Sequence, residues 1–92
     1  MHSVFEWDEN KAQQNLRKHN VPFNEAVTVF RDPLIATMPD PDHSADEERW
    51  IAIGYSSKNR LLVVSFTERG NRTRIISCRR AEPIERKLYE AE

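Results

Sequence analysis

The spacing at which apolar residues recur changes several times along the chain, and each change marks the boundary of a predicted helix or strand. Strands are predicted where apolar residues alternate or are β-branched, at residues 4–7, 34–38, 49–55, 61–66 and 75–78. Helices are predicted where apolar residues recur every three or four positions, at residues 8–20, 23–30 and 83–90. The order β-α-α-β-β-β-β-α predicts an α+β fold, with helices packed on one side of a small antiparallel sheet. A single domain, residues 1–92, is expected.

Local signals at the ends of the predicted helices support these boundaries. Asp8 can accept a hydrogen bond at the start of the first helix, and Asn20 can take the left-handed conformation that ends it. Asp32-Pro33 stops the second helix, and Pro83 suits the first turn of the third.

The stretch 60–81 predicts a β-hairpin with a two-residue turn at Gly70-Asn71, because this dipeptide readily takes positive φ. That turn sets the residues that face each other across the hairpin: Arg69 opposite Arg72, Thr67 opposite Arg74, Phe66 opposite Ile75, and Leu61 opposite Arg80. Since side chains alternate between faces, one face receives apolar residues that suit a core: Leu62, Val64, Phe66 and Ile75. The other face receives four arginines: Arg69, Arg72, Arg74 and Arg80.

This stretch carries six arginines and one acid, Glu68, which gives a local net charge of +5. Like charges that face each other across strands destabilise a sheet, so the cluster suggests an anionic partner. A solvated edge whose arginines pair with acids elsewhere in the chain is the simpler interpretation. Arg79 is expected on the apolar face at the strand end, paired with an acid or with the C-terminal helix.

The strand 49–55 is expected to join the hairpin through a two-residue loop at Lys58-Asn59. That loop sets a further group of facing residues: Tyr55 with Leu62, Ile53 with Val64, Ile51 with Phe66, and Arg49 with Glu68. Trp50 then falls on the arginine face beside Thr67. It could stack on a nucleic-acid base there, or lie flat over the sheet.

Composition narrows the possible function classes. The chain has a net charge of −1, which combines −4 over residues 1–59 with +3 over residues 60–92. This balance argues against indiscriminate coating of nucleic acid, while the C-terminal third could hold a phosphate locally. No apolar run approaches the roughly 18 residues of a membrane span, and the N-terminus has no signal pattern. The one cysteine, Cys78, is expected in the core, and a cytoplasmic location is expected.

The acidic loop, residues 39–48, has two prolines and five acids. Its spacing matches no metal-binding motif, so no metal or other cofactor is expected. His43 within it could supply a proton-transferring group to a neighbouring site, since an imidazole generally titrates near neutral pH.

Seven motifs lie in the order of one known family. They are F-E-W-D-x-x-K at Phe5–Lys11, F-x-E-A-x-x-V-F-x-D-P at Phe23–Pro33, Glu47 with Arg49, Gly54, Thr67-Glu68-Arg69, R-I-I-S-x-R-x-A at Arg74–Ala81, and Glu85 with Tyr89. With them the chain resembles the BrnT family of bacterial type II toxins. Asn20 departs from the glycine expected there, which concerns a helix end rather than the chemistry.

The resemblance implies a RelE-like fold and a ribonuclease activity that stops translation when it is unrestrained. It also implies a partner, a BrnA-like antitoxin of the ribbon-helix-helix class that binds both the toxin and operator DNA. Direct DNA binding by this chain is not expected, because no predicted helix is basic enough to enter a groove.

RNA cleavage without a metal needs a base for the 2′-hydroxyl, cations for the phosphate and an acid for the leaving oxygen. We expect Arg69, Arg74 and Arg80 to hold the phosphate, since guanidinium forks match phosphate oxygens. Glu68 or Glu47 is the expected base and His43 the expected acid, although Glu68 falls on the strand face opposite Arg69. The remaining expected RNA contacts are Arg72, Trp50, Lys58 and Arg49, of which Arg49 also orients Glu68.

A second hypothesis uses the same arginines without chemistry. In it, the domain is a binding module whose basic sheet face docks an acidic protein segment or RNA. Only the enzyme needs the acid and the base, so assays of RNA cleavage distinguish the two hypotheses.

Overall fold

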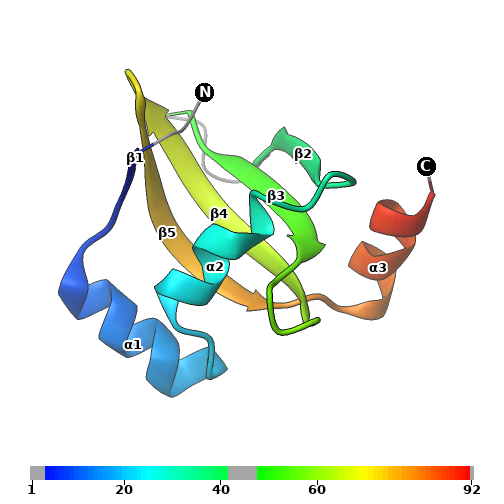
Figure 1. Cartoon of the computed structure of the whole chain (residues 1–92), viewed down its shortest axis with the longest axis horizontal. Coiled ribbons are helices and arrows are strands. Elements are labelled where there is room, and N and C mark those ends of the chain that lie inside the picture. Colours follow the sequence, from blue (N-terminus) through cyan, green and yellow to red (C-terminus); the bar gives the residue numbers. More distant parts are fainter. Residues whose placement is uncertain (1–3, 42–47, 92) are drawn as a thin grey trace.

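A five-stranded sheet with three helices forms the fold in the computed structural model, which describes residues 4–41 and 48–91 (Figure 1). The elements are β1 (Val4–Glu6), α1 (Glu9–His19), α2 (Phe23–Val29), β2 (Ala36–Pro39), β3 (Trp50–Tyr55), β4 (Leu61–Arg69), β5 (Arg72–Arg80) and α3 (Pro83–Glu90). The strand order across the sheet is β1-β5-β4-β3-β2. The α+β class and the order of elements are therefore confirmed. One strand departs from the antiparallel expectation, because β1 runs parallel to β5.

The ends of α1 follow the local chemistry of the sequence. The Asp8 carboxylate accepts a hydrogen bond from the Lys11 backbone N–H at 3.1 Å, which satisfies one of the free donors of the first turn. Asn20 takes the left-handed conformation with φ of 58°, and its N–H donates to the Leu16 carbonyl at 2.9 Å. Both predicted caps are confirmed, so α1 has the expected length.

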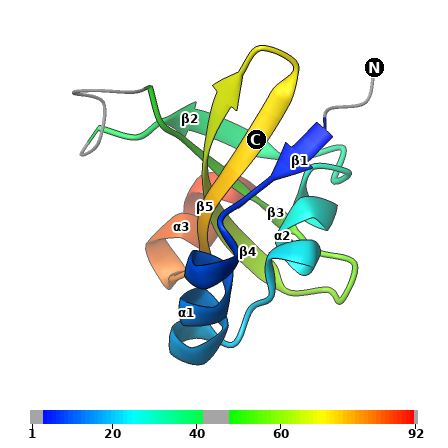
Figure 2. The same ribbon diagram turned by 90° about the vertical axis from the view of Figure 1, so that its left-hand side faces the viewer.

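Two apolar clusters pack on opposite faces of the sheet. The larger lies under α1 and α2 and is built from residues of β3, β4, β5, the two helices and the segment between them: Ala12, Val21, Phe23, Ala26, Val29, Ala52, Leu62, Val64, Phe66, Ile75 and Cys78. The smaller lies under α3 and contains Ile53, Leu61, Val63 and Tyr89. We call these sides the α1/α2 face and the α3 face. Figure 2 shows α2 and α3 on opposite sides of the sheet, so α3 departs from the expectation that all helices lie on one side.

The β4–β5 hairpin turns at Gly70-Asn71, where Gly70 has a φ of 61° that an L-residue rarely adopts. The predicted pairs are confirmed from the turn as far as Phe66 with Ile75. Beyond them a β-bulge leaves Ile76 unpaired, and Leu62 rather than Leu61 faces Arg80. The extra residue reverses the faces of the last part of β5. Arg79 therefore lies on the α3 face and Arg80 on the α1/α2 face, the reverse of the expectation.

The β3–β4 register also differs from the expectation by one residue, since Tyr55 pairs with Leu61 and Trp50 with Phe66. The connecting loop has three residues rather than two: Ser56 N–H donates to the Arg60 carbonyl, and Asn59 closes the turn with a φ of 60°. This shift places Ile51, Ile53 and Tyr55 on the α3 face. Trp50 lies on the α1/α2 face instead, half-buried against the larger cluster.

Asp32 connects α3 to the rest of the domain. Its Oδ2 accepts hydrogen bonds from the Tyr89 hydroxyl at 2.6 Å and from the Tyr55 N–H at 2.8 Å, and its Oδ1 accepts from the Leu34 N–H. Burial raises the pKa of the Asp32 carboxyl. The three hydrogen bonds together lower it by more, so the pKa is below its ordinary value. The hydrogen bond to Asp32, together with burial, raises the pKa of Tyr89 to about 12. Gly54 lies beside this site, where a Cβ would meet Val29 Cγ1 at 3.0 Å.

Candidate nucleic-acid interface

Three arginines gather at the turn end of the β4–β5 hairpin. Arg69 faces Arg72, and Arg74 faces Thr67, so all three side chains project from the α3 face. Residues that face each other across antiparallel strands have Cα atoms about 4.5–5.5 Å apart. We call Arg69, Arg72 and Arg74 the arginine cluster. This part of the sequence prediction, which depends on the register next to the turn, agrees with the structure.

One carboxylate serves two arginines of the cluster. The parallel register of β1 places Glu6 beside Arg74 on the α3 face, where its oxygens lie 3.2 Å from Arg72 Nη1 and 3.4 Å from Arg74 Nη1. The hydrogen bond from Arg72 is the main reason that the pKa of Glu6 is below its ordinary value. The Arg72 side chain is still 62% exposed and that of Arg74 31% exposed. Two guanidinium groups and one carboxylate leave a net charge of +1 from these three residues.

Glu68 does not share this face. It pairs with Thr73 in the ladder, and its carboxylate accepts a hydrogen bond from Thr73 Oγ1 at 2.6 Å on the α1/α2 face. Arg49 precedes Trp50, whose side chain lies on the α1/α2 face, so Arg49 belongs to the α3 face beside Thr67. The expected pairing of Arg49 with Glu68 is therefore wrong, because the register of β3 is shifted by one residue.

The acidic loop leaves and rejoins the sheet next to the arginine cluster. Asp40 N–H donates to the Arg49 carbonyl at 2.9 Å, and Thr67 Oγ1 donates to the Glu48 carbonyl at 2.7 Å. Thr67 is the residue that faces Arg74, so the end of the loop is held against the cluster. His43 and Glu47, the expected acid and base, lie outside the described residues, and their roles remain predictions.

Three of the predicted RNA contacts lie away from the cluster. Arg80 follows Arg74 by six residues of strand, roughly 20 Å, and lies on the other face, so it cannot hold the same phosphate. Lys58 belongs to the β3–β4 loop, at the opposite end of the sheet from Gly70-Asn71 (Figure 1). Trp50 packs against the core on the α1/α2 face, which is inconsistent with base stacking beside the arginines.

Glu6, which the sequence did not single out, completes the site. Glu6 joins the cluster only because β1 is placed beside β5, a long-range pairing that no local signal indicates.

Arg79 was expected to pair with an acid or with the C-terminal helix, and it does both, since its Nη1 lies 2.7 Å from Glu85 Oε1 of α3. This ion pair raises the pKa of Arg79 and lowers that of Glu85.

Within residues 4–41 and 48–91, no group of three or more His, Cys, Asp or Glu side chains is placed to hold a metal ion. In the same ranges no helix is long and apolar enough to cross a membrane.

A family model described as the ribonuclease toxin BrnT of type II toxin-antitoxin systems matches residues 7–85. The chain belongs to the BrnT family. The crystal structure of the Brucella abortus ribonuclease toxin BrnT is similar at 25% sequence identity, with a TM-score of 0.65, over 88% of this chain and 99% of that one. None of the curated protein sequences matches the chain. BrnT toxins are ribonucleases that act in type II pairs, so an antitoxin partner and an RNA target follow from membership.

Proposed function

We propose that this protein is an endoribonuclease that cuts RNA at the arginine cluster and thereby inhibits translation in the cytoplasm. The observation that supports the proposal is the placement of Arg69, Arg72 and Arg74 on one exposed face, with one half-buried carboxylate shared by the last two. A structural role would favour matched, buried ion pairs, whereas Arg72 remains largely exposed.

The arginines supply the positive charge that phosphodiester cleavage needs. A base takes the proton of the 2′-hydroxyl, the 2′-oxygen bonds to phosphorus, and the phosphorus–O5′ bond breaks as an acid donates a proton to O5′. The products are a 2′,3′-cyclic phosphate and a free 5′-hydroxyl. Negative charge accumulates on the phosphate oxygens during this step, and we assign Arg69 and Arg74 to bind them, with Arg72 and Arg49 on flanking phosphates.

We assign the base and the acid to the acidic loop, as Glu47 and His43. Supporting this choice, the loop ends at Glu48 beside Thr67, on the face that carries the cluster. Glu68 projects from the opposite face and is bonded to Thr73, so it is a poor candidate for the base. Glu6 is also a poor base, because its arginine partners lower its pKa.

The proposed cleavage needs no metal ion, because guanidinium groups take the charge-stabilising role. The proposed partner is a BrnA-like antitoxin of the ribbon-helix-helix class, which neutralises the toxin and alone contacts operator DNA. Purified protein should cut single-stranded RNA equally well with and without a chelator. Loss of cutting with the chelator, restored by Mg²⁺, would contradict the metal-free mechanism.

The decisive variant is Arg69→Ala, with Arg17→Ala as a matched control, since Arg17 is exposed on α1 away from the α3 face. Removal of one preorganised donor lowers such rates by about 10²–10³-fold, so Arg69→Ala should abolish growth arrest and RNA cleavage. Circular dichroism should show that both variants fold. If Arg69→Ala is folded, expressed and fully toxic, the assignment of the cluster is wrong.

A non-catalytic binding module is the second candidate. The position of Glu68 favours it, because Glu68 lies on the other face, bonded to Thr73. Within the described residues, the carboxylate beside Arg72 and Arg74 is that of Glu6, which is already paired with them and is a poor base. Such a module would bind RNA or an acidic protein segment with the same dependence on Arg72 and Arg74. Binding of single-stranded RNA without any cleavage product, under conditions in which the antitoxin is absent, would support it over the enzyme.

A further inference from the structure

A second basic site lies at the opposite end of the sheet from the arginine cluster. A pocket of about 280 Å³ opens between the β3–β4 loop, the first residue of β4, the end of β5 and α3. Its lining contains three arginines and few other side chains: Asn59, Arg60, Leu61, Arg80, Ala81 and Arg86. Arg80 enters this site because the bulge at Ile76 turns it away from the face of the arginine cluster.

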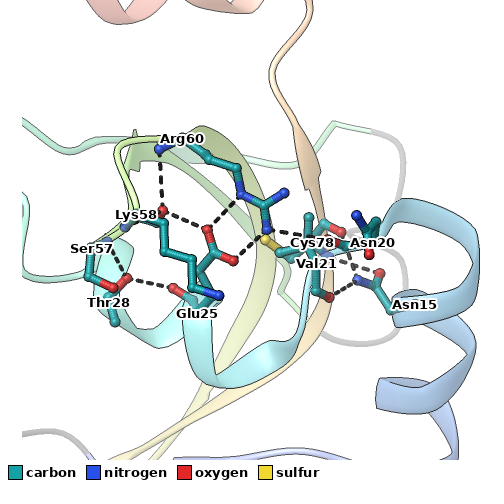
Figure 3. A network of polar contacts seen from close by, with 10 residues as sticks. Asn15, Asn20, Val21, Glu25, Thr28, Ser57, Lys58, Arg60 and Cys78 are labelled. Carbon is teal, nitrogen blue, oxygen red and sulfur yellow. Dashed lines mark hydrogen bonds and ion pairs between the residues drawn. The ribbon is translucent and has the colours of Figure 1, made fainter.

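One wall of the pocket is rigid. Arg60 Nε donates to Glu25 Oε2 at 2.9 Å, and Arg60 Nη2 donates to the same carboxylate and to the Asn20 carbonyl (Figure 3). The Glu25 side chain is only 2% exposed, so this pair is fixed and its charges cancel. Figure 3 shows the Lys58 side chain beside the same network. The guanidinium of Arg60 is therefore a fixed part of the pocket wall whose charge is already neutralised.

The other two arginines are less well matched. Arg86 Nη1 donates to the Tyr55 hydroxyl at 3.1 Å and lies 3.8 Å from Glu90, one turn along α3, which is a weak surface pair. Arg80 is exposed, and within the described residues its side chain has no ion pair. Glu82 is the adjacent acid, and its carboxylate is used to cap α3. The pocket thus keeps an excess of positive charge around Arg80.

We propose that this pocket binds a backbone phosphate of the same single-stranded RNA, several nucleotides from the cut; this inference rests on the proposed function. β5 connects the two sites and carries four arginines and no acid. The separation of Arg74 and Arg80, roughly 20 Å, corresponds to about six nucleotides of stacked strand at about 3.4 Å per phosphate. The exposed Arg80 presents a planar guanidinium that can donate two hydrogen bonds to phosphate oxygens.

The test compares a long and a short RNA on the double variant Arg80→Gln/Arg86→Gln. Both oligonucleotides carry 2′-O-methyl groups, which prevent cleavage; one has about 12 nucleotides and one about four, too short to reach both sites. The affinity for the long RNA, relative to that for the short RNA, should fall about tenfold. The slope of log affinity against log salt for the long RNA should become shallower by about 0.7 for each phosphate that the variant no longer binds. Arg17→Gln is the matched control and should change neither quantity.

The outcomes separate the second phosphate site from the cleavage activity. If the wild type cuts RNA but shows no preference for the long oligonucleotide, or the double variant keeps it, the second phosphate site is wrong and the proposed function stands. If the preference exists and depends on Arg80 and Arg86 while no RNA is cut, the pocket stands and the enzyme proposal fails. Unchanged RNA affinity together with weakened binding of the antitoxin would overturn the RNA site in favour of a protein-docking surface.

Discussion

Arginine has different surroundings at the two ends of this sheet. At the β3–β4 end, Arg60 is 18% exposed and shares a bidentate contact with Glu25, which is buried and also accepts a hydrogen bond from Ser56 Oγ at 2.7 Å. At the β4–β5 turn, Arg72 is 62% exposed and shares Glu6 with Arg74. The first arginine is part of the protein's internal structure, while the others keep hydrogen-bonding capacity for a ligand. Residue type alone does not distinguish the two uses; the burial and number of carboxylate partners do.

Near the Arg60–Glu25 pair, a second buried polar group is the side chain of Asn15 (Figure 3). Asn15 of α1 donates to the carbonyls of Val21 and Cys78 at 3.0 and 2.8 Å and accepts from the Cys78 N–H at 3.1 Å (Figure 3). α1 is therefore attached to β5 by polar contacts inside the core. Cys78 is fully buried, as expected, and burial is the main reason that the pKa of its thiol rises to about 12.

The largest effect on stability is expected from Arg60→Ala, which leaves the buried Glu25 without its partner. Loss of one member of a buried pair costs about 3–5 kcal/mol, and the residual exposure of Arg60 favours the lower value. Urea unfolding at pH 7 measures the free energy. Arg72→Ala should lose little by comparison, and equal losses in the two variants would contradict the contrast between the two ends.

The same pair has a pH signature. The hydrogen bond from Arg60 is the main reason that the pKa of Glu25 is lowered in the wild type. Its stabilisation is therefore present above the ordinary glutamate pKa and is lost as pH falls through the lowered value. In Arg60→Ala, burial without a partner raises that pKa, so the deficit of the variant should shrink in acid. The double variant Glu25→Gln/Arg60→Gln, which removes both charges, should be more stable at pH 7 than Arg60→Ala.

A smaller loss is expected from Asn15→Ala, which leaves the carbonyls of Val21 and Cys78 and one N–H unsatisfied in the core. An unsatisfied buried polar group costs about 1–3 kcal/mol, and partial access of water should keep the total at about 2–3 kcal/mol. Hydrogen exchange at the Cys78 amide should accelerate more than exchange in β3. A global acceleration without this local excess would mean that Asn15 does not specifically attach α1 to β5.

Tyr89→Phe removes the hydroxyl that attaches α3 to Asp32 and should cost about 1.5 kcal/mol, as expected for a hydrogen bond to a charged group. The pKa of Tyr89 is raised to about 12, so this stabilisation is complete below the unfolded value near 10 and is lost as pH rises through 12. Absorbance titration should find one tyrosine that ionises near pH 12, and the signal should vanish in the variant. Ionisation of Tyr89 near the ordinary tyrosine value would exclude the hydrogen bond.

The smallest change concerns Glu6→Gln, which removes the carboxylate shared by Arg72 and Arg74. The unfolding transition should barely move, because Arg72 is largely exposed and solvent screens its pair with Glu6, while the affinity for single-stranded RNA should rise severalfold at low salt. Fluorescence anisotropy with a 2′-O-methyl oligonucleotide measures the change. Glu9→Gln, on α1 away from the α3 face, is the matched control, and equal gains in both would indicate a general charge effect.

Local chemistry made much of this fold predictable. Asp8 and Asn20 define α1, and Gly70-Asn71 fixes the register close enough to the turn to place Arg69, Arg72 and Arg74 on one face. The sequence did not predict the far end of the hairpin. Leu61 to Val64 are all buried, because each face of the sheet has its own apolar cluster. This run therefore has no alternation of apolar and polar residues that could show which side chains point to which face. The position of Glu6 likewise depends on where β1 docks, which is a long-range contact.

Because Ile76 is unpaired, the side chains of β5 alternate between the two sheet faces in one phase before this residue and in the opposite phase after it. If the same residues paired without the bulge, with Ile76 opposite Ser65, every later residue of β5 would move to the other face, so that Arg79 would lose Glu85 and Arg80 would point toward α3. The same composition, charge and arginines are thus compatible with two arrangements at the C-terminal helix, and one skipped pairing decides between them. In alignments of related chains, a gap at this position removes the bulge but leaves the faces of Arg79 and Arg80 unchanged.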